Sequence, residues 1–263
     1  MTAQSTTSPE VRNEPRVART RGKLVGWKFL VAAAIVGALL VGSLLIGEYD
    51  VFNAQDGIDM FSITRVPRTI ALVLAGAAMA MCGLVMQMLT QNRFVSPTTT
   101  GTTEWAGLGL LFVMIVFPGA TVMGRMVGAV VFSFVGAMVF FFFLQRVSLR
   151  SSLIVPIVGI MLGAVVSAVS TFVALQTDML QQLGVWFAGS FTSVYKGQYE
   201  MLWVVLLVVV GVFLLADRLT LAGLGEDFAT SVGMNYRRIV LVGTVMVAIA
   251  VGVVTVVVGN LPF

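Results

Sequence analysis

Few side chains in this sequence could do covalent or metal chemistry. The chain has no histidine and a single cysteine, Cys82, which excludes histidine-based triads, zinc clusters and disulfides within the chain. Ser190 therefore has no histidine to activate it as a nucleophile. Lys23 follows Gly22 without the glycine spacing of a phosphate-binding loop, so the chain has no P-loop with which to hydrolyse ATP. We predict no catalytic residue, metal site or cofactor, and an enzyme is disfavoured.

Two arginines, Arg65 and Arg68, form the first group of charged residues whose position needs an explanation. They bracket Pro67, which suits the first turn of a helix because its missing N–H needs no partner there. A cation is disfavoured at the positive end of a helix dipole. A rim arginine that meets a carboxylate of a partner contributes orientation and association rate. The alternative is an interfacial arginine that anchors the helix end against lipid phosphate.

The second group lies between Leu219 and Arg238 and predicts a short amphipathic helix outside the membrane. Its residues are Leu224, Gly225, Glu226, Asp227, Phe228, Val232 and Gly233. The three large apolar ones recur every four residues on one face, the two acids suit the first turn, and Gly233 is placed as a stop. Such a helix can dock on a partner or rest on lipid headgroups. Its acidic charge argues against the second reading, because anionic headgroups would repel it.

The third group is the polar stretch 92–101, which follows an apolar run. Pro97 and the threonines around it disfavour a continued helix, so we predict irregular backbone. Membranes tolerate such backbone only where protein or water surrounds it. A simple solvated connection is the alternative. Gln87, near the end of the apolar run, either lines a pathway or satisfies a neighbouring backbone group.

The elements that position these groups are membrane helices. Hydrophobic residues make up 58% of the chain and charged residues only 11%, with a mean hydropathy of +1.00. Soluble domains carry about a quarter charged residues, so the composition predicts an all-α, polytopic membrane helix bundle of about seven transmembrane helices. The expected spans are residues 24–46, 69–89, 103–117, 123–144, 153–175, 201–216 and 239–258. Residues 183–191 are apolar but too short to cross, which predicts a re-entrant or interfacial segment.

The distribution of basic residues predicts the topology. Residues 1–23 are polar and predict a disordered cytoplasmic tail ahead of a transmembrane domain over residues 24–263. With the N-terminus inside, four of the 16 basic residues fall outside, namely Arg65, Arg68, Arg125 and Lys196. The other twelve lie on the cytoplasmic side, as the positive-inside rule requires. The distribution of the basic residues is therefore explained by membrane topology. We do not expect the protein to bind nucleic acid.

Three stretches together resemble one known family. They are Arg65-Val66-Pro67-Arg68-Thr69, Gly83-Leu84-Val85-Met86-Gln87 and Asn92-Arg93-Phe94-Val95-Ser96-Pro97. They resemble the second helix and following loop of FecCD/BtuC-type permeases, the membrane subunits of binding-protein-dependent ABC importers for iron-siderophores, haem and vitamin B12. Residues 96–105 are similar to the catecholate-siderophore branch. The family usually has ten spans in a BtuC-like bundle, so about three C-terminal helices are expected to be lacking here.

The resemblance implies a role for each group. Arg65 and Arg68 would pair with acidic residues of an extracytoplasmic substrate-binding protein. The loop 219–238 would be a coupling helix that docks in a groove of an ATPase subunit. The residues implied at an inner gate or pathway are Gln87, Asn92, Ser96, Pro97 and Thr98.

The implied function is that of a permease subunit in the cell membrane that carries an iron-siderophore complex inward. Its implied partners are a second permease subunit, identical or paralogous, two P-loop ATPase subunits, the binding protein, the iron-siderophore and the lipid bilayer. Alternatives are a permease for another large chelate such as haem or cobalamin, a secondary transporter or channel, and a membrane scaffold. Ion coupling is disfavoured because charged residues are nearly absent from the spans.

Overall fold

A computed structural model describes residues 26–45, 61–146 and 153–261 of the chain. The predicted tail over residues 1–23 lies outside the described residues. Within the described ranges every regular element is a helix, which confirms the all-α prediction. The chain divides into two compact units, Met1–Gly42 and Ser43–Phe263.

The first unit contains most of helix α1, Trp27–Leu45. Its 19 residues are apolar and none of them is buried. At about 1.5 Å per residue, such a helix is close to the roughly 30 Å thickness of a bilayer's hydrocarbon core. The first predicted span is therefore present as a helix.

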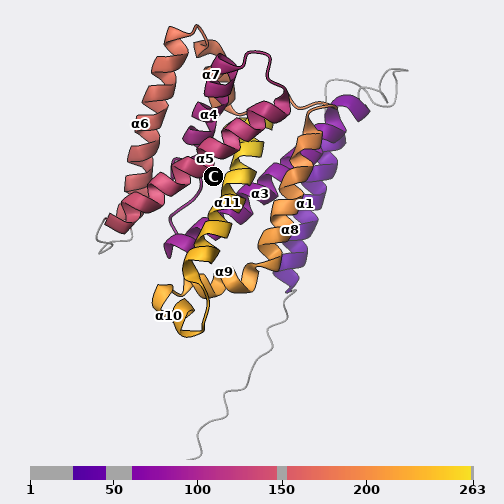
Figure 1. Ribbon diagram of the computed structural model, residues 1–263. Coiled ribbons are helices and arrows are strands. Elements are labelled where there is room, and N and C mark those ends of the chain that lie inside the picture. Colours follow the sequence, from indigo (N-terminus) through magenta and orange to yellow (C-terminus); the bar gives the residue numbers. More distant parts are fainter. Residues whose placement is uncertain (1–25, 46–60, 147–152, 262–263) are drawn as a thin grey trace, which may run out of the picture. The chain divides into compact units, whose positions relative to one another are not determined.

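Two helices form the centre of the second unit. Helix α3, Val66–Thr90, and helix α11, Tyr236–Val257, each bury about half of their residues. Figure 1 shows α11 in yellow, and it packs against α3, α4, α5 and α8. Small residues such as Ala75 and Ala78 on α3 and Gly243 on α11 allow this close packing.

A π-helical turn, η1 (Phe61–Arg65), precedes α3, so the apolar helix runs without a break over Phe61–Thr90. The span predicted over residues 69–89 is therefore too short. The proline still occupies the first turn of α3, where its missing N–H leaves no hydrogen bond unmade.

The remaining helices before the inner loop are shorter or more exposed than α3 and α11. They are α4 (Thr102–Val116), α5 (Val122–Arg146), α6 (Ile154–Gln176), α7 (Leu180–Ala188), the 3₁₀ turn η2 (Tyr199–Leu202) and α8 (Trp203–Leu214). Helix α4 packs against both α5 and α6. A Cβ at Gly109 of α4 would lie 2.6 Å from the Gly128 carbonyl oxygen of α5, so the two glycines permit this crossing.

The seven predicted spans correspond to helical segments of the structure. Five described helices are long and apolar enough to cross a membrane. A sixth span is present if Tyr199–Leu214 and Ala216–Gly223, which are bent by 63° relative to each other, are counted as one. The predicted third span corresponds to the shorter apolar helix Thr102–Val116. The nine-residue helix α7 falls in the segment that was predicted to be too short to cross.

The inner loop differs from the prediction. The chain does not leave the helix at Ala216 but bends into helix α9, Ala216–Gly223, and then forms helix α10, Glu226–Ser231. Leu219 and Ala222 of α9 are buried, so α9 is fixed to the bundle. The helix predicted through Leu224 and Val232 is therefore shorter than expected, because it begins only after Gly225, whose φ is +115°, and ends at Ser231.

Candidate functional site

The candidate residues gather at the two ends of the second unit. Helix α3 begins next to Arg65 and ends at Gln91, and its 25 residues span about 37 Å. Figure 1 shows α9 and α10 together at one end of this unit and α7 at the other. The arginine pair and the α9–α10 loop therefore lie at opposite ends of the bundle.

The two arginines have different surroundings. One terminal nitrogen of Arg65 (Nη1) donates hydrogen bonds to the backbone oxygens of Leu44, at 3.2 Å, and Leu45, at 3.3 Å. This contact resembles the helix-end anchoring that we considered as the alternative, with carbonyl oxygens in place of phosphate. Arg68 is half-buried, and its Nε is buried without a hydrogen-bond partner. Docking of a binding protein by either arginine stays a prediction.

The loop that carries α10 exposes large apolar side chains. Leu224, Phe228 and Val232 are 61%, 47% and 60% exposed. Leu224 and Val232 flank α10 and are not part of it, so the prediction of one continuous helical face is wrong. The three side chains nevertheless lie on one short, exposed loop next to Glu226 and Asp227. We refer to residues 224–233 as the α10 loop.

Gly233 ends α10 as predicted. Its φ is +81°, and its N–H donates to the Thr230 carbonyl at 2.9 Å while the N–H of Met234 donates to the Ala229 carbonyl at 3.0 Å. These two bonds form a Schellman motif, which glycine favours because it lacks a Cβ. The Asn235 side chain then accepts a hydrogen bond from the Arg238 N–H and caps α11.

Residues 92–101 form a buried turn with irregular backbone. The Asn92 side chain accepts a bond from the Phe94 N–H at 2.9 Å, and the hydroxyls of Thr100 and Thr102 donate to the Pro97 carbonyl at 2.9 and 2.7 Å. Asn92, Ser96 and Thr100 are at most 6% exposed. The prediction of irregular backbone is confirmed, and most of the stretch is enclosed by protein, although Arg93 and Phe94 are exposed.

This turn packs on helix α6 through a pair of glycines. A Cβ at Gly159 would overlap the Thr99 carbonyl oxygen, and one at Gly163 would lie 3.3 Å from the Cα of Gly101. The Gly159-xxx-Gly163 spacing is typical of helix–helix contacts, and here it also admits the turn. Glu104, which accepts a bond from the Thr103 hydroxyl at 2.9 Å, also lies next to Gly163.

The end of α3 connects this turn to the α10 loop. A Cβ at Gly225 would lie 3.1 Å from Nε2 of Gln91, and one at Gly223 would lie 3.4 Å from Cβ of Met88. Gln91 immediately precedes the buried turn and adopts a left-handed conformation with φ of +51°. Sequence reasoning did not single out Gln91 or Met88, because no local pattern reports a contact between segments so far apart in the chain.

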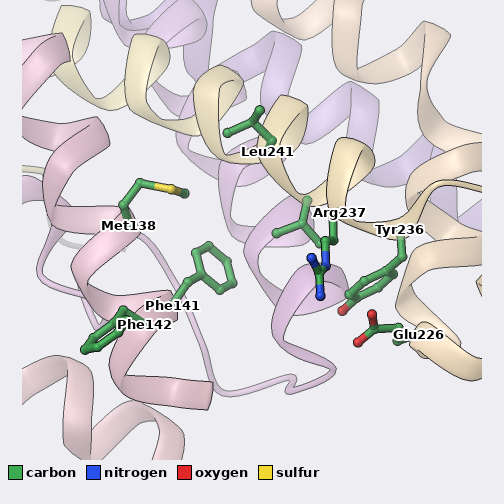
Figure 2. Close-up of a pocket in the computed structure, with 8 residues that line it drawn as sticks. Met138, Phe141, Phe142, Glu226, Tyr236, Arg237 and Leu241 are labelled. Atoms are coloured by element: carbon green, nitrogen blue, oxygen red, sulfur yellow. The ribbon is translucent and has the colours of Figure 1, made fainter. Parts of the chain in front are cut away.

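A cavity of about 490 Å³ lies beside the α10 loop. Figure 2 shows Glu226, Tyr236 and Arg237 close together on one side, with Met138, Phe141 and Phe142 of α5 across from them. The cavity thus has an apolar wall and a charged rim. Glu226, which belongs to the α10 loop, therefore also lines the cavity beside the bundle.

The sequence is similar to curated permeases. The profile of the FecCD transport family matches residues 30–263. Petrobactin import system permease protein FatD of Bacillus anthracis is 60% identical over 235 residues, which cover 89% of this chain and 70% of that protein. Petrobactin import system permease protein YclN of Bacillus subtilis is 40% identical over 80% of this chain and 66% of its own length.

The fold is similar to that of a solved transporter. A metal-chelate type ABC transporter in an inward-facing conformation matches 89% of this chain and 77% of its own, with a TM-score of 0.72 and 23% identity. Because the profile match covers most of the sequence, the chain belongs to the FecCD transport family.

Proposed function

We propose that this chain is the permease subunit of an ABC importer that carries an iron-siderophore complex into the cytoplasm. The observation that carries the proposal is the α10 loop, which exposes apolar side chains while α9 is fixed in the bundle. The names of the relatives support the substrate class, since they import petrobactin and ferric anguibactin.

The α10 loop is the proposed contact with the ATPase subunits. The chain has no P-loop of its own, so the energy for transport has to come from a partner. Exposed Leu224, Phe228 and Val232 suit an apolar groove on that partner. We propose two P-loop ATPase subunits and a second permease subunit, identical or paralogous, in the complete assembly.

The opposite end of the bundle is the proposed docking surface for an extracytoplasmic binding protein. The family and the five long apolar helices make the chain a multi-pass membrane protein. With the N-terminus in the cytoplasm, Arg65 and Arg68 face outward. Their charge suits carboxylates on the binding protein, which would orient the complex.

The contacts along α3 suggest how the two ends communicate. ATP-driven movement of the ATPases would displace the α10 loop, and the contact of Gly225 with Gln91 would pass that displacement to residues 92–101. We propose that this turn, with Gln87, Asn92, Ser96, Pro97 and Thr98, forms part of the inner gate. A packed turn suits this role because packed interfaces switch between discrete arrangements.

Phe228→Asp should abolish co-purification with the ATPase subunit. A carboxylate placed in an apolar groove would lose its hydration without gaining a partner, so we expect at least a tenfold loss of association. The matched control is Thr220→Asp, which adds the same charge at an exposed position on α9, outside the α10 loop. Both variants are purified from membranes with a tagged ATPase. Wild-type association of Phe228→Asp, or transport of the chelate by the isolated chain, would overturn the proposal.

Reversing Arg68 to Glu should weaken docking of the binding protein by about tenfold, with a smaller effect at high salt. The variant should insert normally, because the Arg68 side chain makes no hydrogen bond within the described residues. Arg65→Glu should in addition lower thermal stability, since it removes the bonds to Leu44 and Leu45. Docking is measured by surface plasmon resonance. Unchanged binding by the doubly reversed variant would remove this role from both arginines.

A further inference from the structure

A second cavity, of about 220 Å³, lies at the end of the bundle that carries the arginine pair. It forms where the start of α5, helix α7, the loop 189–198 and the end of α11 meet. The Lys196 N–H donates to the Ile63 carbonyl at 3.0 Å, which ties the loop 189–198 to the turn before α3. The cavity is therefore on the proposed outer face, far from the α10 loop.

Arg125 in the first turn of α5 lines this cavity. Its Nε is buried and has no hydrogen-bond partner, and no ion pair or side-chain bond of Arg125 exists among the described residues. No acidic residue lines the cavity. Glu200, on the neighbouring turn η2, already accepts a bond from the Gly197 N–H. An unpaired, partly buried cation costs stability, so its presence needs a functional explanation.

The other lining residues define which anion would fit. Leu110, Val185 and the end of α11 supply apolar walls, Trp186 supplies an aromatic surface, and Ser193 and Gln198 supply polar atoms. Cavities of about 150 Å³ hold a benzene ring, so this one has room for a ring with one acidic substituent. A whole metal chelate is too large for it.

We propose that the Arg125 cavity binds a single carboxylate or catecholate group of a small organic ligand, with the ring or alkyl body of that group against Trp186. The guanidinium would supply a charge-assisted hydrogen bond, which is stronger than a bond between neutral groups. The inference rests on the proposed function for the source of the group, which would be one arm of an anionic chelate delivered at the outer face. Binding of the acidic group itself does not depend on that function.

The test uses the full chain purified in a maltoside detergent, which has no phosphate, and two probes of nearly equal shape, benzoate and benzamide. Binding is measured by saturation-transfer NMR. We expect benzoate to bind at least about tenfold more tightly than benzamide. Arg125→Gln should abolish this difference, whereas Arg125→Lys should keep most of it. Lys196→Gln, which removes an exposed cation at the same end, should bind benzoate like the wild type.

The stability of the ligand-free variants provides a second measurement. Because Arg125 has no side-chain partner among the described residues, Arg125→Gln should unfold at the same temperature as the wild type or higher. A clear loss of stability would assign Arg125 a structural role and overturn the proposal. Unchanged benzoate binding by Arg125→Gln, or equal binding of benzamide, would also overturn it.

A lipid headgroup is the competing source of an anion. Phosphatidylglycerol is therefore added to the detergent at about one molecule per chain. Benzoate binding should persist, and complete displacement would overturn the assignment to a small organic ligand. Association of Arg125→Gln with the ATPase subunit should equal that of the wild type, so failure of this proposal and failure of the proposed function give different results.

Discussion

Replacing Gly159 by valine is expected to destabilise the protein by about 3 kcal/mol and to abolish uptake. Any Cβ at this position would overlap the Thr99 carbonyl oxygen and lie 2.9 Å from the Cα of Thr100. Both are backbone atoms of the buried turn, which cannot move aside as a flexible side chain can. Overpacking of this kind costs about 1–3 kcal/mol, and more where backbone is involved.

Thermal unfolding of this variant can be measured with the cysteine of the chain itself. Cys82 is free and 1% exposed, so a thiol-reactive fluorophore will report unfolding. We expect the midpoint of the Gly159→Val variant to fall by roughly 10 °C. The control is Gly76→Val, since nothing lies within 4 Å of a Cβ at Gly76. Equal midpoints for the two variants would show that the turn does not pack on α6 as described.

Replacing Gly225 by alanine should uncouple the α10 loop from the bundle. Gly225 has φ of +115° and ψ of +161°, a conformation that is essentially restricted to glycine. Its Cβ would in addition lie 3.1 Å from Nε2 of Gln91. Strain of about 1–3 kcal/mol would be relieved by displacing α10, so association with the ATPase should fall by about tenfold.

A nearby glycine separates this effect from a general loss of order in the loop. Gly233 also has positive φ, but nothing lies within 4 Å of its Cβ position, and asparagine tolerates its left-handed conformation. Gly233→Asn should therefore keep most of the association. The double variant Gly225→Ala/Gln91→Ala should recover only that part of the lost association which is due to contact of the new Cβ with the Gln91 side chain. Wild-type association and uptake of Gly225→Ala would contradict the proposed link between the loop and α3.

The helices could be predicted because their signal is local. A run of about twenty apolar residues has to be helical in a bilayer, where every backbone group needs an internal partner. The same holds for the stop at Gly233, where a glycine after an amphipathic stretch predicts a Schellman motif, and for the irregular backbone around Pro97. Each of these predictions depends on residues within a few positions of one another.

The α10 loop and the glycines Gly159 and Gly163 are two features that local sequence patterns did not predict fully. The four-residue spacing of Leu224, Phe228 and Val232 predicted one helix, but a break at Gly225 separates the short helix α10 from α9, which packs against α3 and α11. The spacing of Gly159 and Gly163 is typical of a contact between two helices, yet the turn at Thr99–Gly101 also approaches them, together with the start of helix α4. The spacing of two glycines indicates that another segment of the chain approaches closely, but it does not identify that segment.

The sequence by itself determined that this is a helical membrane protein of the FecCD family, because composition, apolar runs and short motifs act locally. Only the tertiary structure brought Gln91 to Gly225, packed the threonine turn on α6 and placed Arg125 in a cavity where no described residue pairs with its side chain. Those arrangements join segments that are distant in the chain. Their stability depends on the shapes of the packed segments and on which charges are buried. Neither property can be predicted from a single stretch of sequence.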